Sequence, residues 1–126
     1  AVITRVDKDG RAIESMFNVY EHLEPAIIAA NTNVINLPSE LAKPLKLIVL
    51  DTIVALTTWD RQAGSNSDEG VKRLMAYLRS LALKYSVTIA VVGHANKGKH
   101  DHFADSVMGA SAWTTSPRLS FVHGKD

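Results

Sequence analysis

The chain contains no cysteine among its 126 residues. Disulfide bonds, thiolate zinc sites and cysteine nucleophiles are therefore excluded, and a reducing compartment is compatible with this composition. Long hydrophobic runs are absent too. No apolar stretch approaches the roughly 18 residues of a membrane-spanning helix, and the N-terminus has no signal-peptide core. We therefore expect a cytoplasmic protein that makes no membrane contact.

A strong excess of charge is also missing. The chain has 14 Lys and Arg against 13 Asp and Glu, which gives a formal net charge of +1. A dedicated nucleic-acid-binding protein is usually strongly basic, so any such binding must rest on a local patch. The length and the apolar fraction of 46% are ordinary for one globular domain spanning residues 1–126.

The most informative segment is an apolar run at residues 45–52 that ends at a single carboxylate, Asp51. A strand this apolar is typical of a parallel sheet that helices cover on both faces. An acid at its carboxyl end lies where open α/β sheets bind their ligands. Asp51 is therefore a candidate metal or phosphate-site residue, and the alternative is that it only caps a turn.

A helix and a second apolar strand are predicted to follow. Asn66 and Glu69 form a capping-box-like start, and apolar residues then recur at helical spacing as far as Tyr85. Residues 87–93 form the second apolar run, which ends at His94. The basic residues on the opposite helix face are expected to be solvated: Lys72, Arg73, Arg79 and Lys84.

The order strand, helix, strand predicts a βαβ unit with a right-handed crossover. Its two strands run parallel and end at the same edge of the sheet, so Asp51 and His94 are expected on one rim. There a carboxylate can hold Mg²⁺, and a histidine can donate a hydrogen bond to a phosphate oxygen. The alternative for His94 is an exposed or packed turn histidine.

The remaining segments predict a less regular pattern. Apolar spacing over residues 11–23 suits a helix, which Pro25 should end or break. Residues 33–37 and 119–123 are plausible strands, and residues 57–67 and 94–117 read as loops. The second loop is long for a structureless connection, which points to function or mobility.

Residues 94–102 contain three His, one Asp and two Lys. A zinc site is one interpretation, but the spacing lacks the register of known helical His pairs. A basic loop that contacts phosphates is a second interpretation, and a solvated loop is a third.

Residues 45–123 contain a series of short segments in a fixed order: Asp51-Thr52, Asn66-Ser67, the amphipathic helix, His94-Ala95-Asn96-Lys97-Gly98, Gly109-Ala110-Ser111-Ala112 and Pro117-Arg118. In this order and spacing they resemble the C-terminal half of a RecA-like P-loop ATPase core. In particular, they are similar to RepA-type hexameric replicative helicases and to related phage or plasmid primase–helicase ATPases. The fold that this resemblance implies is α/β, a mostly parallel sheet flanked by helices.

The resemblance implies a site for ATP and Mg²⁺ in the complete protein. Asp51 would match the Walker B carboxylate that orders Mg²⁺, directly or through water, and His94 would match the sensor residue after the next strand. Thr52 and Asn66 would be nucleotide-binding neighbours. Asp51 and His94 are thus both candidate catalytic residues.

The same resemblance implies partners. Lys97, Lys99 and His100 would face single-stranded DNA in the channel of a homo-oligomer, which in this family can be a hexamer. A basic residue would reach the nucleotide of a neighbouring subunit and stabilise charge on the transferring phosphoryl group. The candidates are Arg118, as a catalytic residue, and Lys125, as a nucleotide-binding residue.

The chain departs from this pattern in one decisive respect. It has no G-x-x-x-x-G-K-[ST] motif, so the loop that cradles phosphates is missing, and the catalytic Glu has no clear counterpart. Residues 1–126 alone are therefore expected to bind no nucleotide and to leave ATP unhydrolysed, and we expect them to be the C-terminal portion of a larger ATPase domain.

Two other classes of protein stay open. One is a non-catalytic module of the same fold that binds nucleic acid or protein. The other is a receiver-like domain phosphorylated on Asp51, for which Asp7 and Asp9 would be the acidic pair, although the long loop at residues 94–117 does not fit it.

Overall fold

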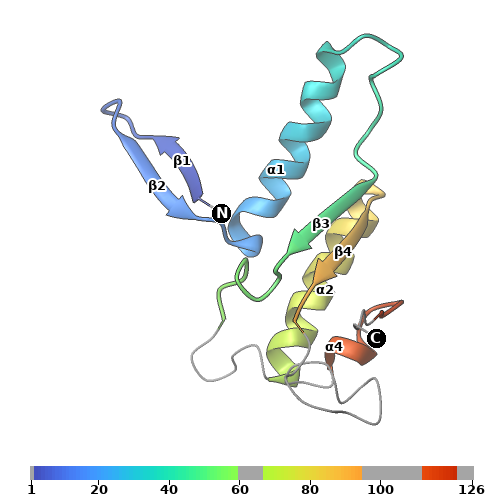
Figure 1. Cartoon of the computed structure of the whole chain (residues 1–126). Helices are drawn as coiled ribbons and strands as arrows, with labels where there is room; N and C mark the ends of the chain where they lie inside the picture. Colours follow the sequence, from blue (N-terminus) through green and yellow to red (C-terminus); the bar gives the residue numbers. More distant parts are fainter. Residues whose placement is uncertain (1, 60–66, 95–111, 122–126) are drawn as a thin grey trace, which may run out of the picture.

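The computed structural model describes residues 2–59, 67–94 and 112–121. Strands and helices alternate along the chain, which makes the protein a small α/β structure with a two-stranded parallel sheet (Figure 1). In chain order the elements are β1 (Val2–Val6), β2 (Ala12–Met16), α1 (Val19–Asn33), the 3-10 helix η1 (Val34–Asn36), β3 (Leu47–Asp51), α2 (Asp68–Tyr85), β4 (Thr88–Val92) and α4 (Ala112–Thr115).

The predicted βαβ unit is confirmed. β3 and β4 pair in parallel, with Leu47 opposite Thr88 and Asp51 opposite Val92, and α2 connects them. α2 begins at the N-cap Ser67, whose Oγ accepts a hydrogen bond from the Gly70 N–H at 3.4 Å. The sequence placed this cap one residue early, at Asn66, which lies outside the described residues.

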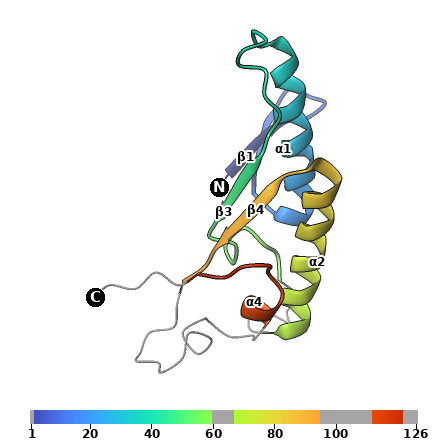
Figure 2. The ribbon, with the colours of Figure 1, turned by 90° about the vertical axis from the view of Figure 1, so that its right-hand side faces the viewer.

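Both long helices lie on the same side of the parallel pair (Figure 2). Apolar side chains of α1, α2, the end of β3 with the turn after it, and the start of α4 form the core: Val19, Leu23, Ile27, Leu50, Ile53, Val71, Leu74, Met75, Leu78, Leu81 and Ala112. The opposite face of the sheet is open within the described chain, where Leu47 is 56% and Val49 is 57% exposed. The prediction that helices cover both faces is therefore wrong for this part of the molecule.

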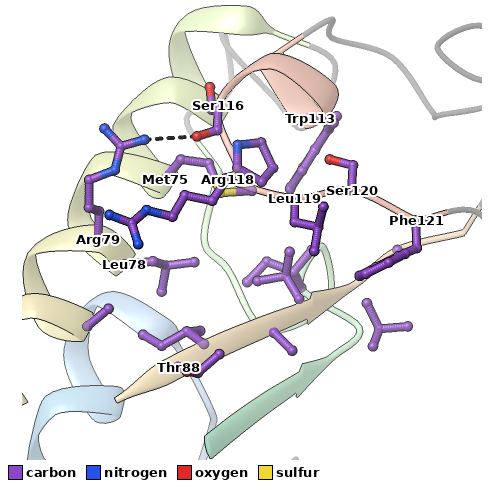
Figure 3. A pocket seen from close by; sticks show the side chains of 18 of the residues that line it. Met75, Leu78, Arg79, Thr88, Trp113, Ser116, Arg118, Leu119, Ser120 and Phe121 are labelled. Atoms are coloured by element: carbon purple, nitrogen blue, oxygen red, sulfur yellow. Dashed lines mark hydrogen bonds between the residues drawn. The ribbon is translucent and has the colours of Figure 1, made fainter. Parts of the chain in front are cut away.

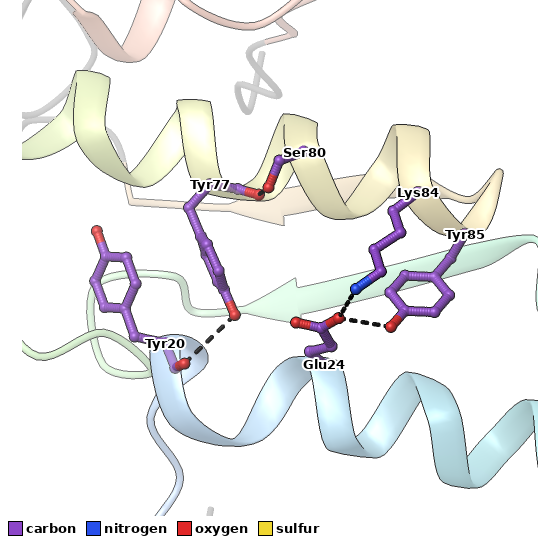
Figure 4. A network of polar contacts seen from close by, with 6 residues as sticks. All are labelled: Tyr20, Glu24, Tyr77, Ser80, Lys84 and Tyr85. Carbon is purple, nitrogen blue, oxygen red and sulfur yellow. Dashed lines mark hydrogen bonds and ion pairs between the residues drawn. The ribbon is translucent and has the colours of Figure 1, made fainter.

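Polar contacts join α1 to α2 beside this core (Figure 4). The Glu24 carboxylate accepts hydrogen bonds from the Lys84 ammonium and from the Tyr85 hydroxyl, each at 2.6 Å. The Tyr77 hydroxyl donates to the Tyr20 carbonyl at 3.4 Å. The basic face of α2 is thus not simply solvated, because Lys84 helps to hold the two helices together.

The helix predicted over residues 11–23 is wrong in its first half. Residues 12–16 instead form β2, which pairs with β1 in an antiparallel hairpin. The turn explains the difference: the Asp7 carboxylate accepts hydrogen bonds from the backbone N–H groups of Asp9 and Arg11, and Gly10 adopts a φ of +78°. A left-handed residue at this position favours glycine and reverses the chain.

α1 starts at Val19 instead. Its N-cap, Asn18, accepts a hydrogen bond from the Tyr20 N–H at 3.2 Å, and the His22 Nδ1 accepts one from the Asn18 N–H at 2.8 Å. Pro25 does not break this helix, because the buried face that includes Leu23 and Ile27 holds the chain on both sides of it.

Two predicted strands are not found where the structure can test them. Residues 33–37 contain the end of α1 and then η1. Residues 119–121 are not in a strand, and residues 122–123 lie outside the described chain. No helix in the described part of the chain combines the length and the hydropathy that crossing a membrane requires.

Candidate functional site

The carboxyl ends of the two parallel strands form the candidate site. Asp51 is the last residue of β3 and is paired in register with Val92, the last residue of β4. His94 follows Val92 by two positions, so both side chains belong to the same edge of the sheet. The prediction that the two apolar strands run parallel and end together is confirmed, while the chemical roles of Asp51 and His94 stay predictions.

The turn after Asp51 is anchored to the rest of the molecule. The Ile53 N–H donates to the Val92 carbonyl at 3.0 Å, and the Ile53 side chain is buried in the core. The Thr57 hydroxyl donates to the Ile53 carbonyl at 2.7 Å, and the Leu56 carbonyl accepts from the Val19 N–H at 2.8 Å. This turn therefore fixes the direction in which the chain leaves β3.

Asp51 itself is exposed, and its peptide bond to the half-buried Thr52 is cis. No hydrogen bond or ion pair within the described residues engages its carboxylate. An exposed carboxylate of this kind is free to bind a cation. Mg²⁺ commonly takes only one or two carboxylates and completes its shell with water and phosphate oxygens.

A multidentate metal site is not seen beside it. Among the described residues, no three His, Asp or Glu side chains lie close enough together to hold a metal ion. The zinc interpretation of residues 94–102 stays a prediction, since residues 95–102 lie outside the described chain.

A groove of about 1220 Å³ opens beside β4. We call it the β4 groove: it lies between β4, one side of α2 and residues 113–121 (Figure 3). His94 and Arg118 both line it, and Asp51 does not. The structure thus brings His94 and Arg118 to one groove and places Asp51 on the adjoining edge of the sheet.

Sequence reasoning missed how α4 is positioned. The Asp68 carboxylate, at the start of α2, accepts a hydrogen bond from the Ala112 N–H at 2.9 Å. The Arg79 guanidinium donates to the Ser116 carbonyl at 2.9 Å, so α2 holds this segment at both ends. Trp113 packs edge-on against Trp59, with ring centroids 5.9 Å apart. No local pattern predicts contacts between residues this far apart in sequence.

The other predicted site residues lie outside the described chain, and their placement is not part of this structure. They are the nucleotide-site candidates Asn66 and Lys125 and the nucleic-acid candidates Lys97, Lys99 and His100.

Comparison of the chain with models of protein families, with curated protein sequences and with solved structures finds no match. The function is therefore inferred from the residues of this chain and their geometry.

Proposed function

We propose that this chain forms the Mg²⁺ and phosphate edge of a RecA-like ATPase, a helicase-type motor that acts on DNA in its complete form. The observation that supports this best is the pairing of Asp51 with Val92 at the ends of two parallel strands, two residues before His94. Ligands of open α/β sheets bind beyond the carboxyl ends of such strands.

Each residue has a distinct role in this proposal. The Asp51 carboxylate orders Mg²⁺ through its water shell, and Thr52 adds a hydroxyl beside it. The His94 imidazole donates a hydrogen bond to the terminal phosphate. Arg118, on the wall of the β4 groove, supplies positive charge to a phosphoryl group during transfer.

The 126 residues contain no phosphate-binding loop of the P-loop type, so the proposal requires one from additional polypeptide. The same proposal includes single-stranded DNA as a partner, which would contact Lys97, Lys99 and His100. It also includes assembly of the complete protein into a ring. The competing function is a non-catalytic module of the same fold. It predicts that the complete protein hydrolyses no ATP, with or without single-stranded DNA.

The test is an ATPase assay on the longest polypeptide encoded in frame with this chain, with and without single-stranded DNA. Asp51→Asn removes the charge and keeps the shape of the side chain, so we expect turnover to fall by about 100-fold or more. Glu40→Gln is the matched control, because Glu40 is an exposed acid away from the strand ends. We expect that control to keep its turnover.

Circular dichroism should show that Asp51→Asn unfolds at the same temperature as the parent, since the carboxylate has no partner among the described residues. Full turnover in Asp51→Asn would remove Asp51 from the proposed role. A parent polypeptide that neither binds nor hydrolyses ATP would favour the non-catalytic module.

A further inference from the structure

β4 has an edge that pairs with no strand of the described chain, because the sheet there consists of β3 and β4 alone. On its paired side, the Thr88 N–H donates to the Lys46 carbonyl at 2.8 Å and the Val92 carbonyl accepts from Ile53. Successive residues of a strand direct their backbone groups to opposite sides. The N–H and C=O groups of Ile89 and Val91 therefore point away from β3, and both residues line the β4 groove.

The opposite wall of the groove is formed by residues 119–121, which belong to no helix or strand. Leu119 is 69% exposed and Phe121 is 83% exposed, and both reach from this segment toward β4 (Figure 3). Covering large, exposed apolar side chains with another apolar surface lowers the free energy of the system. The groove is thus bordered by the free edge of β4 on one side and by exposed apolar side chains on the other, which is a setting for one more strand.

The side chains that line the groove indicate which kind of molecule it can bind. Met75 and Leu78 of α2 form an apolar floor. Arg79, Arg118 and His94 are the titratable side chains among the described lining residues, which include no Asp or Glu. An occupant with an aliphatic middle and a carboxylate near one end complements this distribution of charge.

We propose that the β4 groove binds one extended peptide strand of a partner polypeptide, aliphatic in its middle and acidic near one end. The strand pairs with the outward backbone groups of Ile89 and Val91 and covers Leu119 and Phe121. Such strand addition draws affinity from main-chain hydrogen bonds and specificity from side-chain pockets. This interface shares His94 and Arg118 with the proposed nucleotide chemistry, but the pairing of the strand with β4 does not require ATP.

The first experiment measures amide exchange by NMR on the 126-residue chain. The probe is a synthetic peptide of about eight residues, alternating valine and threonine and ending in aspartate. At saturation we expect the amides of Ile89 and Val91 to exchange about tenfold more slowly or better, whereas the amides of Thr88 and Ala90, which face β3, change little. The control peptide carries proline at its centre and should protect neither pair, because proline lacks the N–H that pairing needs.

A pair of variants tests the wall of the groove. Phe121→Asp puts a charge where the peptide should pack, and we expect its affinity for the peptide to fall by about tenfold. Leu41→Asp makes the same kind of change at a residue that is 65% exposed and does not line the groove, so it should bind as the parent does. Both side chains are exposed, so both variants should fold.

Three results would overturn the proposal. The first is unchanged exchange at Ile89 and Val91 with millimolar peptide, and the second is equal protection by the proline peptide. The third is protection that rises with protein concentration alone, with a dimer in sedimentation, because the occupant would then be a second copy of the chain. None of these outcomes depends on ATP hydrolysis, so this interface and the proposed function can fail separately.

Discussion

The described part of the chain contains two small sheets that are held together in different ways. β1 and β2 are neighbours in sequence, and a glycine turn with the Asp7 carboxylate joins them. β3 and β4 are separated by α2, and helices cover one face of the pair (Figures 1 and 2). The hairpin leaves large apolar side chains exposed on its strands, including Val6, Ile13 and Met16.

This difference shows where each sheet obtains its stability. The hairpin relies on local turn geometry, and an isolated two-stranded hairpin is marginal in water. The two strands of the parallel pair are far apart in sequence, so their pairing costs more conformational entropy. The stability of the pair therefore depends on the apolar side chains that pack against one of its faces. A change to the core should therefore affect the parallel pair most, and a change to the turn should affect the hairpin alone.

The largest expected effect comes from Leu74→Ala. Leu74 on α2 is fully buried in the core under the parallel pair. Removing a buried leucine side chain should lower the free energy of unfolding by roughly 2–5 kcal/mol, measured by urea denaturation. Leu83→Ala is the control on the same helix: Leu83 is 74% exposed, so its effect should stay within about 0.5 kcal/mol. Equal effects of the two variants would mean that this core does not support the parallel pair.

Gly10→Ala should have a smaller and local effect. Gly10 has a φ of +78°, and no atom lies within 4 Å of the position that a Cβ would take. The cost is therefore conformational, about 1 kcal/mol, and should appear as faster exchange of the Asp7 amide, which donates to the Arg11 carbonyl at 2.9 Å.

Gly93→Ala provides the matched control for this change, since it is equally uncrowded and is not left-handed. It should leave the hairpin amides unchanged. Faster exchange of the β3 and β4 amides in Gly10→Ala than in the parent, or loss of those strands, would show that the two sheets are coupled.

The smallest expected effect is on how stability depends on pH. It arises from a contact between α1 and α2, the helices that cover the parallel pair. The Lys84 ammonium, followed by the Tyr85 hydroxyl, holds the pKa of the Glu24 carboxyl below its usual 4.5 by hydrogen bonding. A carboxyl whose pKa is lower in the folded chain stabilises that chain above its unfolded pKa. This contribution is lost as the pH falls through the lowered pKa.

Thermal unfolding should therefore show a steeper loss of stability between about pH 5 and pH 3 in the parent than in Glu24→Gln. Glu40→Gln, at an exposed position, should follow the parent curve. If Glu24→Gln and the parent lose stability in parallel, the contact between Glu24 and Lys84 does not stabilise the helix pair.

The sequence predicted the central unit well, for reasons that particular residues make clear. The apolar runs that end at Asp51 and His94 each contain a single polar residue, Lys46 and Thr88, and the apolar residues of α2 recur without a break. Parallel pairing then follows because the helical connection returns the chain to the end of the sheet where the first strand began. The shared edge for Asp51 and His94 could therefore be expected before the structure was known.

The N-terminal part was predicted less well because its signals conflict. Ile13, Met16 and Phe17 fit one face of a helix, but the turn formed by Asp7 and Gly10 favours a hairpin, and the turn prevails. Pro25 lies inside α1 because tertiary packing of the helix outweighs one lost hydrogen bond. The contacts of Asp68 with Ala112 and of Arg79 with Ser116 bridge distant residues, and no local pattern indicates them.

The sequence by itself determined the strands and helix of the central unit, because hydrophobic periodicity is a local property that each segment carries alone. Only the tertiary structure decided which face of the sheet is covered, how α2 holds α4, and that a groove lies along the outer edge of β4. These features depend on which distant segments meet, and the free energy of their contacts exists only once the chain has folded.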